Sequence, residues 1–139
     1  MENPSLPPHA LAIGMVLEQH GNQRCTLRIP YSDHLIGDPD TGVIHGGVIT
    51  AALDNASGMA VRMGDEGPVE NVTMATLDLR IDYMRAANPG KDLYAEAECY
   101  KTTPQVAFVR AVAYDITAED PVATSVATFM IGTANTPRQ

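Results

Sequence analysis

Residues 45–63 read HGGVITAALDNASGMAVRM, and this stretch determines how the rest of the chain is arranged. After a His-Gly-Gly turn, small and apolar residues point in every direction around a helix of 3.6 residues per turn. A helix that is apolar all round is normally buried, so we expect a central helix of about 25 Å over residues 47–63. The glycines and the proline in residues 64–68 are typical of a helix end.

One acidic residue interrupts this apolar pattern. Thr50, Asp54 and Ser57 fall at i, i+4 and i+7 and share one face of the helix. Burying an unpaired carboxylate costs several kcal/mol, which is on the order of the whole stability of a domain. Asp54 therefore predicts either a structural partner or a functional role.

Length and composition indicate one soluble domain. The chain has 139 residues, a formal net charge of −8 and no basic run, which argues against a nucleic-acid partner. No apolar run approaches the ~20 residues of a membrane span, and the N-terminus lacks the basic region of a signal peptide. We therefore expect a cytoplasmic protein without membrane contact, in which Cys25 and Cys99 stay reduced.

The remaining segments predict an antiparallel sheet. Residues 1–10 read as a flexible arm, 11–132 as a single domain and 133–139 as a polar tail. Residues 12–19 and 24–29 suggest a hairpin, and 30–44 a loop. Four strands joined by short connections follow, over 76–83, 93–100, 105–115 and 122–131. The sum is an α+β domain in which five to six strands curl around the helix.

Nucleophile, metal-binding and nucleotide-binding motifs are absent from the sequence. Two features therefore remain as candidates for a chemical role: the helix start at Gly46 and Gly47, and the Asp54 carboxylate. Gly46 and Gly47 leave bare backbone N–H groups at a helix N-terminus, which suits an oxygen that becomes an oxyanion. Two turns further on, Asp54 can act as a general base or as a nucleophile. Taken singly, each feature has a plainer explanation: a tight turn, a structural His45, or an Asp54 paired with Arg80 or Arg110.

Together, these residues resemble a known family. His-Gly-Gly, an Asp nine residues after the His, and an alternating strand ending in Tyr-Met-Arg are similar to the PaaI-type hot-dog-fold acyl-CoA thioesterases. The resemblance covers roughly residues 42–131. It implies a curved sheet around one long helix, and a homodimer or homotetramer with active sites at the subunit interface. It implies no metal and no cofactor beyond the CoA of the substrate.

The resemblance also implies site residues. Asp54 matches the catalytic carboxylate, Gly47 the residue whose N–H polarises the thioester carbonyl, and His45 the helix-entry histidine, with Gly46 beside the substrate. Thr76 matches a position that orients the attacking water. Three further positions match CoA contacts: Arg85, Lys101 and Thr103. Pro39 replaces an Asn that many members place six residues before the His.

The sequence thus predicts hydrolysis of an acyl-CoA thioester to free acid and CoA, and it leaves the acyl group open. Two alternatives remain in the same fold. One is a hydratase or dehydratase acting on acyl thioesters, since His45 and Asp54 are both present. The other is a dimer that binds acyl-CoA without catalysis, which the replacement at Pro39 favours.

Overall fold

A computed structural model describes residues 6–64, 67–68 and 73–132. Its elements, in chain order, are α1 (Pro8–Ala12), β1 (Val16–Gly21), β2 (Arg24–Ile29), a 3₁₀ turn (Asp33–Leu35), β3 (Ile36–Asp38), β4 (Val43–Ile44), α2 (Gly46–Arg62), β5 (Met63–Gly64), β6 (Gly67–Pro68), β7 (Met74–Tyr83), β8 (Leu93–Thr102), β9 (Val106–Tyr114) and β10 (Ala123–Ile131).

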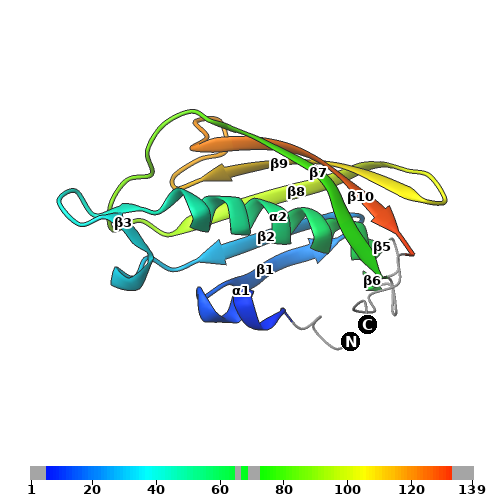
Figure 1. Ribbon diagram of the computed structural model, residues 1–139, viewed down its shortest axis with the longest axis horizontal. Helices are drawn as coiled ribbons and strands as arrows, with labels where there is room; N and C mark the ends of the chain where they lie inside the picture. Colours follow the sequence, from blue (N-terminus) through cyan, green and yellow to red (C-terminus); the bar gives the residue numbers. More distant parts are fainter. Residues whose placement is uncertain (1–5, 65–66, 69–72, 133–139) are drawn as a thin grey trace, which may run out of the picture.

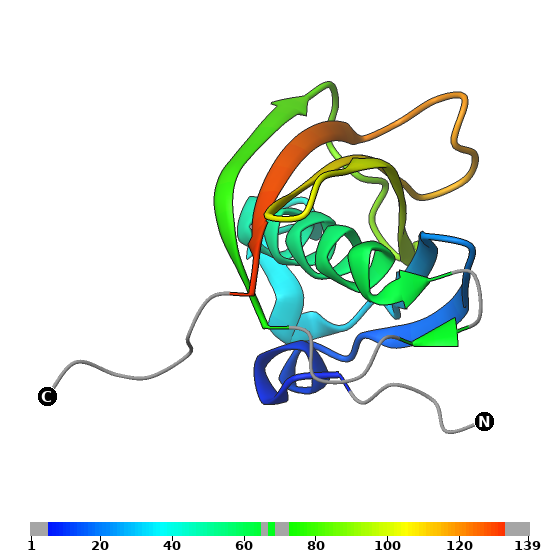
Figure 2. The ribbon, with the colours of Figure 1, turned by 90° about the vertical axis from the view of Figure 1, so that its right-hand side faces the viewer.

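Six of the strands form one antiparallel sheet in the order β1-β2-β8-β9-β10-β7. The sheet curls around α2, which is seen nearly end-on in Figure 2. β7, the first long strand after the helix, lies at one edge of the sheet (Figure 1). The predicted α+β architecture, with a curved sheet around one long helix, is confirmed.

The core lies between the helix and the inner face of the sheet. Alternate residues of β8, β9 and β10 are buried, which is the period of two expected for a sheet with one covered face. Many of them are alanines, so the helix can lie close to the strands. On α2, Leu53, Ala56 and Ala60 are fully buried against this surface.

The helix is not buried on all sides, which corrects the expectation from its composition. Asp54, Asn55 and Gly58 are half-buried and Arg62 is exposed, so a stripe along α2 stays open. The sheet leaves this stripe uncovered because it ends at the edge strand β7. Ser57, expected on the face of Asp54, is instead fully buried.

Two other expectations about local structure need correction. The arm expected over residues 1–10 is helical from Pro8 onward, because Ala10 packs into the core. The loop expected over residues 30–44 contains the small β3–β4 hairpin. Its turn is built by Asp38, whose carboxylate accepts hydrogen bonds from the Asp40 N–H and the Thr41 hydroxyl. Residues 1–5 and the tail over 133–139 lie outside the described residues.

Candidate active site

Asp54 and Thr76 meet in the structure. The Thr76 hydroxyl on β7 donates a hydrogen bond to Asp54 Oδ1 over 3.1 Å. Asp54 Oδ2 stays available to accept a second hydrogen bond, because a carboxylate has two acceptor oxygens. Arg80 instead pairs with Asp82, and Arg110 lies over the ring of Tyr100. The alternative that Asp54 is neutralised by either arginine is therefore wrong.

A β-bulge brings Thr76 to the helix side of the sheet. Strict alternation along β7 places Thr76 on the outer face with Asp78, Arg80 and Asp82. In the structure, Asp78 pairs with Thr128 and Thr76 pairs with Phe129, so Leu77 is an extra residue in β7. This bulge shifts the alternation by one residue. Thr76 and Tyr83 thus both lie on the side of β7 that faces α2.

Asp54 and Thr76 line a cavity of about 380 Å³ beside the open stripe of α2. Its other walls combine the polar residues Asn55 and Arg62 with apolar residues, which include Leu6, Pro7, Met59, Met74 and Phe129. The volume is within the range of small-molecule sites, about 300–1,000 Å³. A carboxylate beside a cavity with both apolar and polar walls suits a substrate that has an apolar group and one reactive polar centre.

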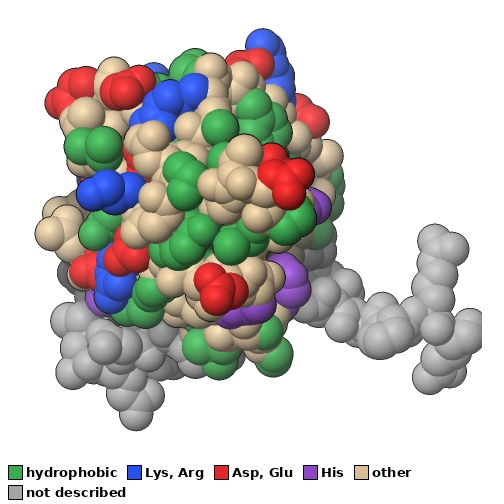
Figure 3. Space-filling model, turned by 90° about the vertical axis from the view of Figure 1, so that its left-hand side faces the viewer, with side chains coloured by type: hydrophobic (Ala, Val, Ile, Leu, Met, Phe, Trp, Pro, Cys, Tyr) green, Lys and Arg blue, Asp and Glu red, His purple; other side chains and the backbone are tan. Residues whose placement is uncertain are grey.

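The N-terminus of α2 differs in detail from the expectation. His45 is the N-cap, and its Nδ1 accepts a hydrogen bond from the Gly47 N–H over 2.8 Å. Gly46 is the first residue of the helix, and no acceptor for its N–H occurs among the described residues. The open donor is therefore Gly46, whereas the predicted donor, Gly47, is engaged by His45. Both glycines are exposed, at an end of the molecule where histidine, acidic and hydrophobic side chains lie close together (Figure 3).

The carboxylate and the open N–H are too far apart within one chain to share a substrate carbonyl. Gly46 and Asp54 are eight residues apart, which is about 12 Å along a helix that rises 1.5 Å per residue. A general base and an oxyanion donor must each lie about 3 Å from their reacting atoms. The Asp54 carboxylate and the Gly46 N–H of one chain therefore cannot act on the same substrate carbonyl.

Arg85 is already paired within the chain. Its guanidinium donates to both carboxylate oxygens of Asp115, over 2.6 and 3.1 Å, and to the Asp120 backbone carbonyl over 2.9 Å. The side chain of Asp115 is 1% exposed. The Arg85 hydrogen bonds, together with those from Asn88, hold the pKa of Asp115 well below its usual range. These contacts give Arg85 a structural role that competes with the predicted contact to CoA phosphate.

Lys101 and Thr103 do not join the other predicted residues within one chain. Both are exposed near the β8–β9 turn, at the end of the molecule opposite the start of α2 (Figure 1). Thr103 is engaged locally, since its hydroxyl accepts a hydrogen bond from the Val106 N–H over 3.0 Å. Their predicted contact with CoA stays a prediction.

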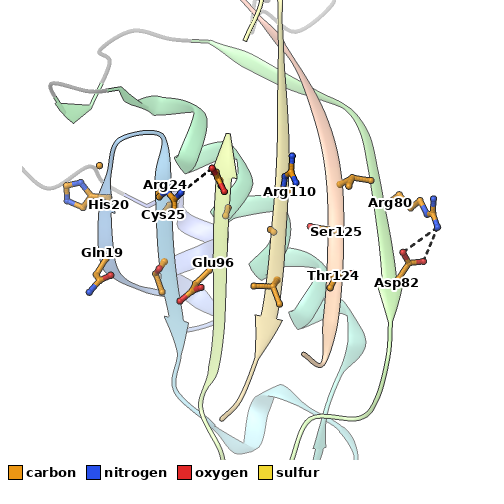
Figure 4. Close-up of a pocket in the computed structure, with 17 residues that line it drawn as sticks. Gln19, His20, Arg24, Cys25, Arg80, Asp82, Glu96, Arg110, Thr124 and Ser125 are labelled. Carbon is orange, nitrogen blue, oxygen red and sulfur yellow. Dashed lines mark hydrogen bonds and ion pairs between the residues drawn. The ribbon is translucent and has the colours of Figure 1, made fainter. Parts of the chain in front are cut away.

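A second and larger hollow, of about 720 Å³, lies on the outer face of the sheet and excludes Asp54. Most of its charged side chains pair with neighbours (Figure 4): Arg24 pairs with Glu98 over 3.2 Å and Arg80 with Asp82 over 3.4 Å. Glu96 accepts a hydrogen bond from Tyr114 over 2.7 Å. Mutual pairing of this kind is typical of a solvated sheet face, so we place the chemistry at Asp54.

Among the described residues, neither the cysteines nor a metal-binding cluster adds to the site. Burial raises the pKa of the Cys25 thiol to about 12 and also raises the pKa of Cys99, so both stay protonated at neutral pH. In the part of the chain that the structure describes, no three His, Cys, Asp or Glu side chains gather to share a metal ion. None of the described helices is long and apolar enough to cross a membrane.

The fold and site define a class: an α+β domain with a carboxylate and a bare helix N-terminus on one helix. Comparison with known proteins gives the family. The profile of the thioesterase superfamily matches residues 41–121, which is more than half of the chain. The chain therefore belongs to the thioesterase superfamily, and its activity is that of a thioester hydrolase.

Two characterised or classified proteins are similar to this chain in sequence. The medium/long-chain acyl-CoA thioesterase YigI of Escherichia coli is 29% identical over 136 residues, covering 90% of this chain and 86% of YigI. A Halobacterium salinarum protein described as a candidate esterase is 37% identical over 86 residues, covering 61% of this chain. This chain spans 55% of the length of the Halobacterium protein.

Two solved structures show the same fold. A Pseudomonas aeruginosa protein has 42% identity and a TM-score of 0.72, with 88% of each chain covered. The N33D mutant of the phenylacetic acid degradation protein PaaI from Thermus thermophilus has 22% identity and a TM-score of 0.74, covering 89% of this chain and 98% of PaaI. With the family match, these structures confirm the predicted resemblance to PaaI-type hot-dog thioesterases.

Proposed function

We propose that the protein hydrolyses acyl-CoA thioesters to free acid and CoA, at a site shared between two subunits. The observation that carries the proposal is Asp54 held by Thr76 at the edge of a cavity that is partly lined by apolar side chains. YigI, which the chain resembles over 90% of its length, is described as an acyl-CoA thioesterase. No metal or further cofactor takes part in the proposed reaction.

The proposed mechanism uses Asp54 as a general base. Its Oδ2 takes a proton from a water molecule, and the water oxygen bonds to the thioester carbonyl carbon. The carbonyl electron pair moves to oxygen, where a helix N-terminal N–H stabilises the oxyanion. When the intermediate collapses, the carbon–sulfur bond breaks, the acid is released, and Asp54 returns its proton to the CoA thiolate. Direct attack by Asp54 on the carbonyl is the covalent version of the same arrangement.

A second subunit completes the proposed site, because about 12 Å of helix separates Asp54 from Gly46. The open stripe of α2 beside the edge strand β7 is the surface that a partner would cover. Within the N-terminus of α2, we assign the oxyanion to the Gly46 N–H, since His45 engages the N–H of Gly47. A homodimer is the smallest assembly that gives each Asp54 a partner helix N-terminus.

Medium or longer aliphatic acyl groups are the proposed substrate class. The cavity beside Asp54 is lined by Met59, Met74 and Phe129, and methionine side chains adapt to flexible apolar ligands. YigI, which this chain resembles, is a medium/long-chain acyl-CoA thioesterase. Aromatic acyl groups are the alternative, favoured by the structural similarity to PaaI.

The test is release of free thiol from acyl-CoAs of increasing aliphatic length and from phenylacetyl-CoA. We expect turnover of the aliphatic substrates, and a kcat lower by about 100-fold or more in Asp54→Asn, since general-base catalysis contributes 10²–10⁴-fold. Asp40→Asn, on an exposed loop, is the matched control. Because both cysteines are buried, the native protein adds little background to a thiol reagent. The proposal fails if no thioester is hydrolysed, or if folded Asp54→Asn matches wild type.

A further inference from the structure

Two consecutive glycines at the start of α2 pose a physical problem. Gly46 and Gly47 have more backbone freedom than any other residue type, yet an oxyanion donor works only when it is already in place. The helix itself supplies part of the order, because the Val48 N–H donates to the His45 carbonyl over 2.9 Å. The rest must come from side chains around the two glycines.

The peptide group that joins Gly46 to Gly47 is held at both ends. Its N–H, on Gly47, donates to His45 Nδ1 over 2.8 Å. Its carbonyl, on Gly46, accepts a hydrogen bond from the Tyr83 hydroxyl over 3.0 Å and lies 3.2 Å from the Thr50 hydroxyl. Tyr83 comes from the end of β7, so this contact fastens the start of the helix to the edge of the sheet.

The Tyr83 and Thr50 hydroxyls share the hydrogen bond to the Gly46 carbonyl. The Tyr83 and Thr50 oxygens lie 2.5 Å apart, and a contact that short requires a shared hydrogen. Each hydroxyl has one hydrogen, so only one of the two donates to the Gly46 carbonyl while the other donates to its neighbour. Either hydroxyl alone can therefore hold the carbonyl, although the shorter distance favours Tyr83 as the direct donor.

The same strand also holds the carboxylate. Thr76 near the start of β7 donates to Asp54, and Tyr83 at its end donates to Gly46. Both side chains face the helix because the bulge at Leu77 shifts the alternation between them. One edge strand thus fixes both groups that the proposed reaction needs.

We infer that Tyr83 and Thr50 form a hydroxyl pair that positions the oxyanion-binding turn of α2 by holding the Gly46 carbonyl. This inference rests on the proposed function. Tyr83 is 52% exposed, and the pair touches the backbone of the turn through Gly46. Both are positioning residues, which act on the oxyanion through the peptide groups of Gly46.

The test is a double-mutant cycle with Tyr83→Phe and Thr50→Val. Each single variant leaves one hydroxyl that can hold the carbonyl, so we expect each to lower kcat by about 3-fold or less. The double variant loses both donors, and its kcat falls by about 10-fold or more, beyond the product of the single effects. KM stays within about 2-fold, because the pair is used mainly as negative charge develops on oxygen.

Controls separate positioning from general stability. Thr50→Ser keeps the hydroxyl and is expected to retain wild-type kcat. Tyr100→Phe removes a hydroxyl from an exposed tyrosine on β8 and is expected to change nothing. The inference is overturned if the double variant retains wild-type kcat, or if KM rises as much as kcat falls.

Amide hydrogen exchange tests the pair independently of activity. If the pair holds the turn, the Gly47 amide exchanges about 10-fold faster or more in the double variant, while amides in the middle of α2 keep their rates. This result is expected even if the wild type hydrolyses no thioester, so failure of the proposed function is distinguishable from failure of the inference. Unchanged exchange at Gly47 overturns it.

Discussion

Removing the carboxylate of Asp115 is expected to destabilise the protein strongly. Its side chain is 1% exposed and accepts hydrogen bonds from Arg85 and from the backbone and side chain of Asn88. Asp115→Ala leaves the Arg85 guanidinium without its main counter-ion and the Asn88 N–H without its acceptor. Removing one partner of a buried ion pair costs about 3–5 kcal/mol. For a domain of this size that corresponds to a fall in Tm of about 6–20 °C.

The assay is urea unfolding followed by circular dichroism at fixed protein concentration, since association with a partner also changes apparent stability. Asp120→Ala is the matched control, because Asp120 also lies beside Arg85, 3.4 Å away, but its side chain is 74% exposed. We expect the control to lose less than about 1 kcal/mol. Equal effects of the two variants would refute the structural role given to Arg85 and Asp115.

The same pair predicts a pH dependence. Arg85 lowers the pKa of Asp115 in the folded protein, so the unfolded chain binds more protons in acid. The stabilisation is therefore complete above the unfolded pKa of about 4 and is lost as pH falls toward the lower, folded value. The difference in unfolding free energy between wild type and Asp115→Ala should shrink below pH 4. A difference that is constant between pH 7 and pH 3 contradicts this sign.

Three further predictions concern the site. Thr76→Val removes the hydroxyl that orients Asp54, and we expect kcat to fall by about 3- to 10-fold with stability nearly unchanged. Thr76→Ser should retain activity, and a wild-type kcat in Thr76→Val would contradict the assigned role. His45→Ala removes the cap acceptor and should lower the unfolding free energy by about 1 kcal/mol, while His45→Asn, a good N-cap, should recover it; no recovery would show that the cap is not the cause. Lys101→Ala should raise KM for acyl-CoA but leave KM unchanged for an acyl thioester that lacks the nucleotide, and equal effects on both would exclude a CoA phosphate contact.

The architecture could be predicted because its signals are local. The apolar stretch over 45–63 and the period-two strands specify α2 and four strands within a few residues of their observed ends. The site is less predictable, because contacts between distant segments create it. Alternation alone puts Thr76 on the wrong face of β7, and only pairing with β10 reveals the bulge at Leu77.

The oxyanion donor, likewise, could not be identified from the sequence alone. The sequence shows two glycines at a helix start, but it does not show which N–H the preceding histidine engages. That choice depends on the rotamer of His45, whose ring nitrogen reaches Gly47 rather than Gly46. The sequence places Tyr83 at the end of a strand and in the Tyr-Met-Arg motif, but nothing local predicts that its hydroxyl meets the Gly46 carbonyl 37 residues away. Likewise, the composition of α2 suggests burial on all sides, although the sheet ends before it covers Asp54.

Mixed dimers test whether Asp54 of one subunit acts with the helix N-terminus of another. Gly46→Pro removes the candidate N–H at the first helical position, where proline is well tolerated. Asp54→Asn removes the base. Each variant alone should be nearly inactive.

When the two variants are unfolded and refolded together, half of the dimers combine them, and each such dimer contains one intact site. We expect recovery of about one quarter of wild-type activity, which is the value for random pairing in a two-fold symmetric dimer. Activity that stays at the level of the separate variants, in mixtures shown to contain the mixed dimer, would contradict a site shared between subunits.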